Sequence, residues 1–278
     1  MTSDNLLALK GITKEYKEFR LGPLDLSVPR GYVMGLVGAN GAGKTTAIKI
    51  ALGAVLPGNG SAHLIDKTRV GVVLDQPCWQ ATWRVRDLSR LLGPFYPGWD
   101  QRVFDELCEW AGVSQRLKVR EFSRGMGMKV QVAVALAHRA ELLVLDEPTS
   151  GLDPLARSEL LDKLSEFMTD ERHSVLFSTH ITTDLDRMAD LITILDAGRV
   201  IASGARDDLL EAWAMVRGGA ADLTGELRVR IRGLRQHSAG WEGLIAAADL
   251  GLCGTGVVAD TPSVEDLLVH LTKERKDA

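Results

Sequence analysis

Long apolar segments are missing from this 278-residue sequence. No run of about 18 apolar residues occurs anywhere, and the N-terminus lacks the basic-then-apolar order of a signal peptide. We therefore expect a chain that neither crosses nor enters a membrane. Internal repeats and low-complexity segments are also absent, so the chain is expected to form one large or two modest domains with a substantial core.

The sequence also has few cysteines and no excess of positive charge. Cys78, Cys108 and Cys253 are widely spaced and form no CxxC pair, which predicts ordinary thiols in a reducing compartment and no cysteine-based metal site. The formal net charge is −4 and the pI is near 5.9. Because affinity for a phosphate backbone needs a concentrated basic surface, we expect no nucleic-acid partner.

What the sequence does contain is a phosphate-binding loop within residues 32–46, where an apolar strand leads into a glycine-rich turn and then a helix-compatible segment. Three glycines allow backbone N–H groups to converge on a polyphosphate at a helix N-terminus: Gly38, Gly41 and Gly43. Lys44 is expected to reach the β- and γ-phosphates, and the Thr45 hydroxyl to ligate Mg²⁺. The alternative is a turn that binds nothing, but chance would produce this spacing in only roughly one chain in a hundred.

A second apolar run, residues 142–145, is followed by two acids. This pattern is typical of a central parallel strand that presents carboxylates at its C-terminal end. Asp146 is expected to hold the Mg²⁺ that bridges the β- and γ-phosphates, and Glu147 to polarise water for attack on the γ-phosphorus. Gln76 and His180, each at the end of an expected strand, fit γ-phosphate sensors. Either one alone would more often be a solvated loop residue or a hydrogen-bonded histidine.

Together these residues resemble the ATP-binding subunit of an ABC transporter, and the resemblance covers roughly residues 5–215. Its motifs occur in the family's order: the adenine-stacking aromatic at Tyr16, Walker A at residues 38–45, the glutamine loop at Gln76, Walker B at residues 142–146, the catalytic glutamate at Glu147, the D-loop at residues 150–153 and the switch histidine at His180. For Tyr16 a simple packing role is the alternative.

The resemblance implies ATP and Mg²⁺ as cofactors. It assigns ATP binding to Tyr16, Gly38, Asn40, Gly41, Gly43, Lys44, Thr45 and Thr46, and to Ser123 and Gly125 acting from the opposing subunit. It assigns Mg²⁺ to Thr45, Gln76 and Asp146, the last directly or through water, and catalysis to Glu147, His180 and Gln76. A second ATPase subunit is therefore expected, most simply in a homodimer and otherwise in a heterodimer, together with an integral membrane permease. The location implied is cytoplasmic, peripheral on the inner face of the membrane.

The signature motif departs from the family pattern. It usually reads Leu-Ser-Gly-Gly-Gln, and here residues 122–126 read Phe-Ser-Arg-Gly-Met. The serine and the second glycine survive, so Arg124 and Met126 are expected to tune ATP affinity or partner choice without removing the hydrolytic machinery. A Ser-basic-Gly-Met signature is similar to that of bacterial single-domain exporter ATPases, which favours export.

The expected fold class is α/β: a P-loop NTPase core with a mostly parallel sheet, an antiparallel β subdomain and a helical subdomain insertion. We expect an ATP-binding domain over residues 1–217, with the helical subdomain at about 77–140, and a small appendage of unknown role over residues 218–278. In the appendage the patterns predict a strand at 227–231, a helix at 241–248 and a capped helix at 262–273.

Two other classes of function remain open from the sequence. One is a soluble ABC-type ATPase acting on ribosomes or DNA, and the other is a regulatory subunit that binds nucleotide without hydrolysis; the acid and histidine at Glu147 and His180 argue against the latter. For the permease contact, Trp79 and Trp83 are placed to line a groove that receives a cytoplasmic helix, with burial in the helical subdomain core as the alternative.

Overall fold

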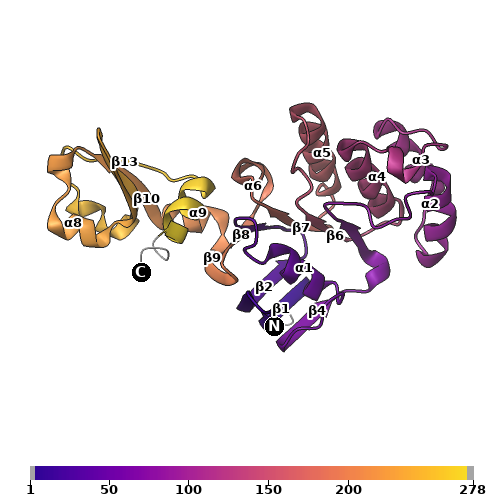
Figure 1. Ribbon diagram of the computed structural model, residues 1–278, viewed down its shortest axis with the longest axis horizontal. Coiled ribbons are helices and arrows are strands. Elements are labelled where there is room, and N and C mark those ends of the chain that lie inside the picture. The colour runs from indigo at the N-terminus through magenta and orange to yellow at the C-terminus, as the bar shows by residue number, and fades with distance from the viewer. Residues whose placement is uncertain (1–3, 274–278) are drawn as a thin grey trace.

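A six-stranded sheet lies at the centre of the molecule in the computed structural model, which describes residues 4–273 (Figure 1). Its strands run in the order β5 (Val70–Val73), β6 (Leu142–Asp146), β7 (Ser174–Thr179), β3 (Val33–Val37), β8 (Leu191–Asp196) and β9 (Arg199–Ala205). The first five are parallel, and the edge strand β9 is antiparallel. Strands β3, β6 and β7 are buried at every position, as expected of parallel strands covered on both faces.

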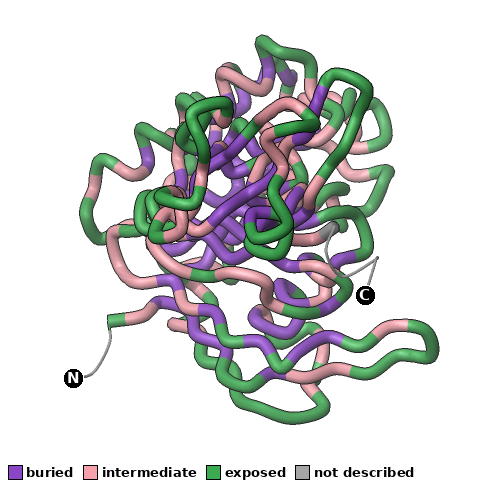
Figure 2. The backbone as a smooth tube through the Cα atoms, turned by 90° about the vertical axis from the view of Figure 1, so that its left-hand side faces the viewer, coloured by how far each residue is buried: buried purple, intermediate pink, exposed green. Residues whose placement is uncertain are grey.

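Different layers cover the two faces of this sheet. Side chains alternate along β3, so Met34 and Leu36 point to one face and Val33 and Val37 to the other. The first face packs against α1 (Lys44–Ala51) and an antiparallel sheet of β2 (Arg20–Pro29), β1 (Asn5–Glu15) and β4 (Asn59–Leu64). The second face packs against α4 (Arg124–Ala137), α5 (Pro154–Phe167) and α6 (Thr182–Met188). Figure 2 shows the buried backbone gathered at the centre, with exposed loops around it.

A helical group lies between β5 and β6 in the chain and consists of α2 (Val85–Leu92), α3 (Gln101–Trp110) and α4. These helices share an apolar cluster that includes Leu88, Phe104 and Val130. Ser123 caps α4, because its hydroxyl accepts a hydrogen bond from the Met126 N–H at 3.2 Å. Since α4 also contributes to the cluster beneath the central sheet, it joins the helical group to the core.

A third sheet follows α7 (Arg206–Glu211), with strands in the order β11 (Arg232–His237), β12 (Gly240–Ala246), β10 (Trp213–Gly218) and β13 (Val258–Asp260). One face packs with α8 (Gly225–Arg230) around Trp241. The other face carries α9 (Val264–Lys273), which packs against α6. As predicted, α9 is capped, with the Ser263 hydroxyl accepting from the Asp266 N–H at 3.1 Å.

The strand predicted over residues 227–231 is wrong, because α8 occupies this segment. Leu227 and Ile231 are only 1% and 6% exposed, whereas Val229 between them is 79% exposed. Residues four apart also share one face of a helix, so this alternation fits either structure. The Thr224 hydroxyl decides the outcome locally, since it caps the helix by accepting from the Leu227 N–H at 3.1 Å.

The helix predicted over residues 241–248 is also wrong, because β12 occupies this segment. Trp241 and Ile245 pack on the face toward α8, and Leu244 packs on the face toward α9. Both faces of this strand are covered, so its apolar residues recur at a spacing that mimics a helix.

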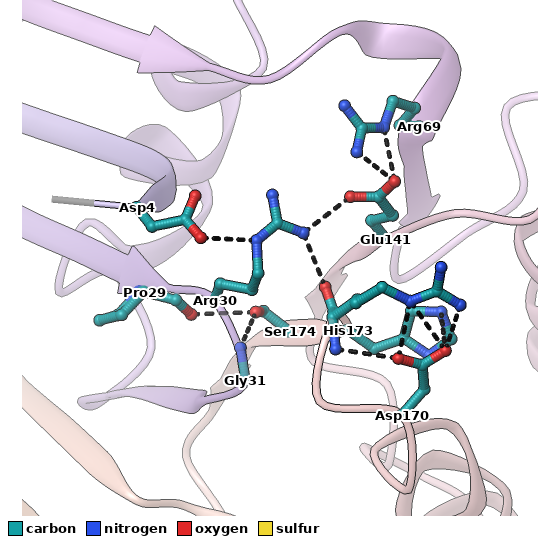
Figure 3. A network of polar contacts seen from close by, with 10 residues as sticks. Asp4, Pro29, Arg30, Gly31, Arg69, Glu141, Asp170, His173 and Ser174 are labelled. Carbon is teal, nitrogen blue, oxygen red and sulfur yellow. Dashed lines mark hydrogen bonds and ion pairs between the residues drawn. The ribbon is translucent and has the colours of Figure 1, made fainter. Parts of the chain in front are cut away.

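A polar network ties together the starts of four parallel strands (Figure 3). Arg30, before β3, donates to Asp4 at 2.8 Å and to Glu141, before β6, at 2.9 Å. Arg69, before β5, donates to the same glutamate at 2.7 Å, and Ser174, the first residue of β7, hydrogen-bonds to the segment that leads into β3. Burial acts to raise the pKa of Glu141, but hydrogen bonds from both arginines outweigh it and hold that pKa below its usual range.

The predicted α/β architecture is confirmed: a mostly parallel central sheet, an antiparallel sheet beside it and helices inserted between β5 and β6. None of the helices within residues 4–273 combines the length and the apolar character that a membrane crossing would need. The polar network lies at the amino ends of the strands, and ligands of open α/β sheets bind at the opposite, carboxyl edge.

Candidate active site

The phosphate-binding loop follows β3 at the carboxyl edge of the central sheet. Gly41 and Gly43 have φ values of 82° and 111°, in the left-handed region that glycine adopts without strain. Gly38 must also lack a side chain, because a Cβ there would lie 2.3 Å from the carbonyl oxygen of Leu195. The chain thereby turns tightly into α1, whose first N–H groups are available to an anion.

Lys44 is 5% exposed and folds back over this loop. Its ammonium donates to the carbonyl oxygens of Gly38 at 2.7 Å and Ala39 at 3.2 Å. It also lies 2.9 Å from Oε1 of Glu147, at the end of β6. This contact is an ion pair without hydrogen-bond geometry, since Glu147 Oε1 has no hydrogen-bond partner among the described residues. Lys44 therefore links the loop after β3 to the acidic end of β6, two strands away in the sheet.

Asp146 is the last residue of β6 and is 4% exposed. Its Oδ1 accepts a hydrogen bond from the Ser178 hydroxyl of β7 at 2.7 Å. The bond fixes the carboxylate and leaves Oδ2 as the oxygen available to a cation.

Glu147 leaves the strand with a φ of 52°, an uncommon value for a residue other than glycine. Its N–H donates to the Ser178 carbonyl oxygen at 3.1 Å. Its Oε2 lies 2.6 Å from Nδ1 of His180 and accepts a hydrogen bond when that nitrogen carries the proton. The carboxylate is thus held between a lysine and a histidine.

Strand register explains why these groups meet. Asp146 pairs with Ser178, and Val37 pairs with Thr179, so the residues that follow the three strands emerge side by side. The structure therefore brings Lys44, Asp146, Glu147 and His180 together at the carboxyl edge of the sheet.

The remaining predicted residues surround this centre in different ways. Thr45 and Thr46 lie in the first turn of α1, Asn40 is exposed in the loop and Gln76 is exposed after β5. Ser123 and Gly125 stand at the start of α4, and Tyr16 is 46% exposed with its ring centroid 6.4 Å from that of Phe19. Within residues 4–273, neither Tyr16 nor Ser123 hydrogen-bonds to Lys44, Glu147 or His180.

Sequence reasoning missed two supporting groups. Ser178 was visible only as a polar residue in an apolar strand. Asp184 on α6 is 1% exposed and accepts from Thr149 at 2.6 Å and from Arg157 at 2.7 Å. This carboxylate ties the segment after Glu147 to the helix after His180, and its partners are too distant in the chain for a local pattern to reveal them.

Mg²⁺ usually takes one or two carboxylates, other oxygens and the phosphates of its substrate. Among the described residues, no cluster of three or more His, Cys, Asp or Glu could hold a metal ion by itself. The free Asp146 Oδ2 and the exposed Thr45 fit the sparse oxygen set of a phosphate-assisted Mg²⁺ site.

Known proteins are similar to this chain in sequence. The family model described as ABC transporter matches residues 21–150. Nod factor export ATP-binding protein I of Cupriavidus pinatubonensis is 34% identical over 224 residues, which cover 74% of this chain and 68% of that protein. Daunorubicin resistance ATP-binding protein DrrA3 of Streptomyces coeruleorubidus is 33% identical over 223 residues, covering 74% of this chain and 70% of that protein.

Solved structures agree with the fold. The structure of an ATP binding subunit of an ABC transporter matches with a TM-score of 0.65 at 29% identity, and the match covers 73% of this chain and 91% of that chain.

Proposed function

The chain belongs to the ABC transporter family of ATP-binding subunits, and on this premise we propose that Lys44, Glu147 and His180 carry out its ATP hydrolysis. As a member of that family it binds nucleotide and is an ATPase that energises transport through a separate permease. The observation that carries the assignment is the placement of the Glu147 carboxylate between the Lys44 ammonium and the His180 ring at the carboxyl edge of the sheet.

In the proposed mechanism, Lys44 exchanges its ion pair with Glu147 for a contact with the γ-phosphate of ATP. Glu147 is then free to accept a proton from the attacking water, and His180 orients that carboxylate through Nδ1. Tyr16 stacks on the adenine, while Asn40, Thr46 and the loop glycines hold the phosphates. Gln76 senses the γ-phosphate from the end of β5.

Mg²⁺ is proposed as the cofactor, held by Asp146, Thr45 and Gln76, and it would neutralise charge that develops on the phosphates. Asp146 is prepared for this role because Ser178 fixes one of its oxygens and leaves the other unengaged by that bond.

The second half of each site is proposed to come from a partner subunit, in a homodimer or in a pair with a related ATPase. Ser123 and Gly125 would contact the γ-phosphate held by the opposing chain. Their position supports this, since they stand exposed or partly exposed at the start of α4, without a hydrogen bond to the Lys44 site of the same chain.

Export is the proposed direction of transport. One similar relative is named for Nod factor export and another for daunorubicin resistance. The chain would then act at the cytoplasmic face of the membrane, held there by its permease.

The permease is proposed to dock beside Trp79 and Trp83. Both tryptophans are partly buried and pack against the cluster of the helical group, so their burial alone does not distinguish the two roles. Next to Trp83, a cavity of about 470 Å³ is lined by four cations, Arg84, Arg86, Arg90 and Lys118, with Asp87 and Thr82. This charge favours an acidic segment on the permease. Arg86→Glu should abolish co-purification with permease-containing membranes and leave soluble ATPase intact, whereas retained co-purification would contradict the docking site.

A division into parts is proposed as well: an ATP-binding domain up to about residue 217, with a helical subdomain near residues 77–140, and a C-terminal unit after it. The separate apolar clusters around Phe104 and around Trp241 support this division, while β10 of the third sheet begins at Trp213, before the proposed boundary.

The test of the hydrolytic site compares two variants of the purified protein. Glu147→Gln should retain ATP binding and lose turnover by at least about 10²-fold, whereas Lys44→Ala should weaken ATP binding itself. Glu171→Gln, the same change on an exposed loop, is the matched control. Wild-type turnover in Glu147→Gln would show that another group is the base.

A further inference from the structure

Arg124 replaces the first glycine of the signature motif and makes contacts that a glycine cannot make. It occupies the first position of α4, directly after Ser123. Its guanidinium forms an ion pair with Asp75, the residue before Gln76. Its Nε donates to the carbonyl oxygen of Ser150 at 2.5 Å.

The backbone near Ser150 is shaped to receive this side chain. Gly151 has a φ of 68°, and a Cβ added there would lie 3.0 Å from Nε of Arg124. A side chain at position 151 would therefore press on the arginine. One residue thus joins three segments: the signature turn, the strand end before Gln76 and the loop after Glu147.

Helix stability does not account for an arginine at this position. A cation at a helix N-terminus is disfavoured by the macrodipole, and Ser123 already caps the helix. The side chains of Arg124 and Asp75 are 40% and 48% exposed, so solvent screens the pair and its contribution to folding is small. The Arg124–Asp75 contact is therefore of interest for the segments that it connects and not for its contribution to stability.

We infer that Arg124 is a positioning residue that couples the two ATP sites of the dimer. It fixes Ser123 and Gly125, which act on the partner's nucleotide, to the Gln76 and Glu147 segments of its own site. A movement of Gln76 when one site fills is thereby transmitted to the signature turn that serves the other site. This inference rests on the proposed function of those residues, and it adds the connection between them.

The test measures ATPase rate against ATP concentration in Arg124→Gln, Asp75→Asn and the double variant. We expect a Hill coefficient above 1 for the wild type. Each single change should lower this coefficient toward 1 and raise the half-saturating ATP concentration by about three- to tenfold. The double variant should lie within about twofold of the singles, because both remove one shared contact. Arg120→Gln removes the same charge from a nearby exposed position and should behave as wild type.

Three outcomes would overturn the inference: no cooperativity in the wild type, additive losses in the double variant, or a loss in Arg124→Gln alone. The last would mean that Arg124 acts through Ser150 alone or directly on nucleotide, and that the link to Asp75 is incidental.

Hydrogen exchange of the nucleotide-free protein separates this inference from the proposed function, since it needs no turnover. The peptide that covers residues 75–78 should exchange faster than in wild type in both single variants, and the peptide that covers residues 148–152 should do so in Arg124→Gln, which also loses the Ser150 contact, with unchanged melting temperature. Unchanged exchange in both segments would refute the connection even in an active enzyme. Faster exchange in a protein without ATPase activity would preserve the connection and reject the proposed catalytic roles.

Discussion

At the scale of single residues, the conformation of Glu147 is the most informative feature of the site. A φ of 52° is uncommon for a residue with a Cβ, and residues in this region typically cost about 1–3 kcal/mol. Two hydrogen bonds hold the residue there: its N–H donates to the Ser178 hydroxyl oxygen at 3.2 Å, and its Oε2 lies 2.6 Å from His180 Nδ1. This conformation accompanies a carboxylate that lies 2.9 Å from the Lys44 ammonium, so stability competes with the proposed catalytic role at this position.

This competition can be measured by comparing Glu147→Gly with Glu147→Ala. Both variants lose the carboxylate and should lose turnover by at least about 10²-fold. Glycine adopts the left-handed region without strain, so Glu147→Gly should be more stable than Glu147→Ala by about 1 kcal/mol in denaturant unfolding. Equal stabilities would show that the backbone relaxes when the side chain is removed.

The residues of the site were readable because they lie in short motifs: Lys44 in its glycine-rich loop, and Asp146 and Glu147 at the end of an apolar run. The contacts between these residues could not be predicted from the sequence. Lys44 meets Glu147, and Arg124 meets Asp75, across long stretches of chain whose meeting depends on strand order. No local pattern encodes such a pair.

At the scale of elements, the end of α4 is joined to the central sheet by a buried histidine. His138 places Nδ1 2.9 Å from the Val134 carbonyl oxygen and Nε2 3.3 Å from that of Val70, just at the start of β5. Its ring stacks on Tyr96 with centroids 4.1 Å apart. Burial lowers the pKa of His138, although hydrogen bonds to these two carbonyls oppose the effect.

A histidine whose pKa is depressed in the folded state binds protons more readily when unfolded. Its contribution to stability is therefore complete above the unfolded pKa of about 6.5 and is lost as pH falls through the lower folded value. We expect the free energy of unfolding to decrease between pH 7.5 and 5.5, approaching about 1.4 kcal/mol per pH unit at most from this group.

His138→Gln should flatten that decrease in urea unfolding at a series of pH values, whereas the exposed His63→Gln should leave it unchanged. An identical slope in His138→Gln and wild type would assign the effect to other groups. Glu141 acts in the same direction but in a more acidic range, because its pKa is depressed below that of an ordinary carboxyl.

Elements were predicted well where one signal dominated. The strand at residues 142–146 and the C-terminal helix after Ser263 follow from an unbroken apolar run and a capping serine. In the C-terminal part a strand was predicted where α8 lies and a helix where β12 lies. A short amphipathic helix and a strand covered on both faces produce overlapping apolar patterns. The Thr224 cap favours the helix locally at α8, whereas tertiary packing on both faces decides the strand at β12.

At the scale of the whole molecule, the proposed dimer makes a prediction about Ser123. Aspartate caps helices as well as serine does, so Ser123→Asp should keep α4 intact while it repels the phosphate of the opposing site. In a Glu147→Gln background with ATP, size-exclusion chromatography should show a dimer that Ser123→Asp converts to monomer. Ser123→Thr should remain dimeric, and a dimeric Ser123→Asp protein would contradict a contact between Ser123 and nucleotide.

The packing of α9 on α6 has a practical consequence for anyone who tries to isolate the ATP-binding portion alone. Met215, Leu244, Val264 and Leu267 belong to the same apolar cluster as Leu185, so the third sheet shields part of the ATP-binding core from water. A protein shortened to end at Glu211 would expose that apolar area, and contiguous exposed patches of this kind promote aggregation. It should scatter light and elute in the void volume at concentrations where the full chain stays monodisperse, and replacing Leu185 by a polar residue should not restore it, because Leu185 also packs over Gly35 of β3.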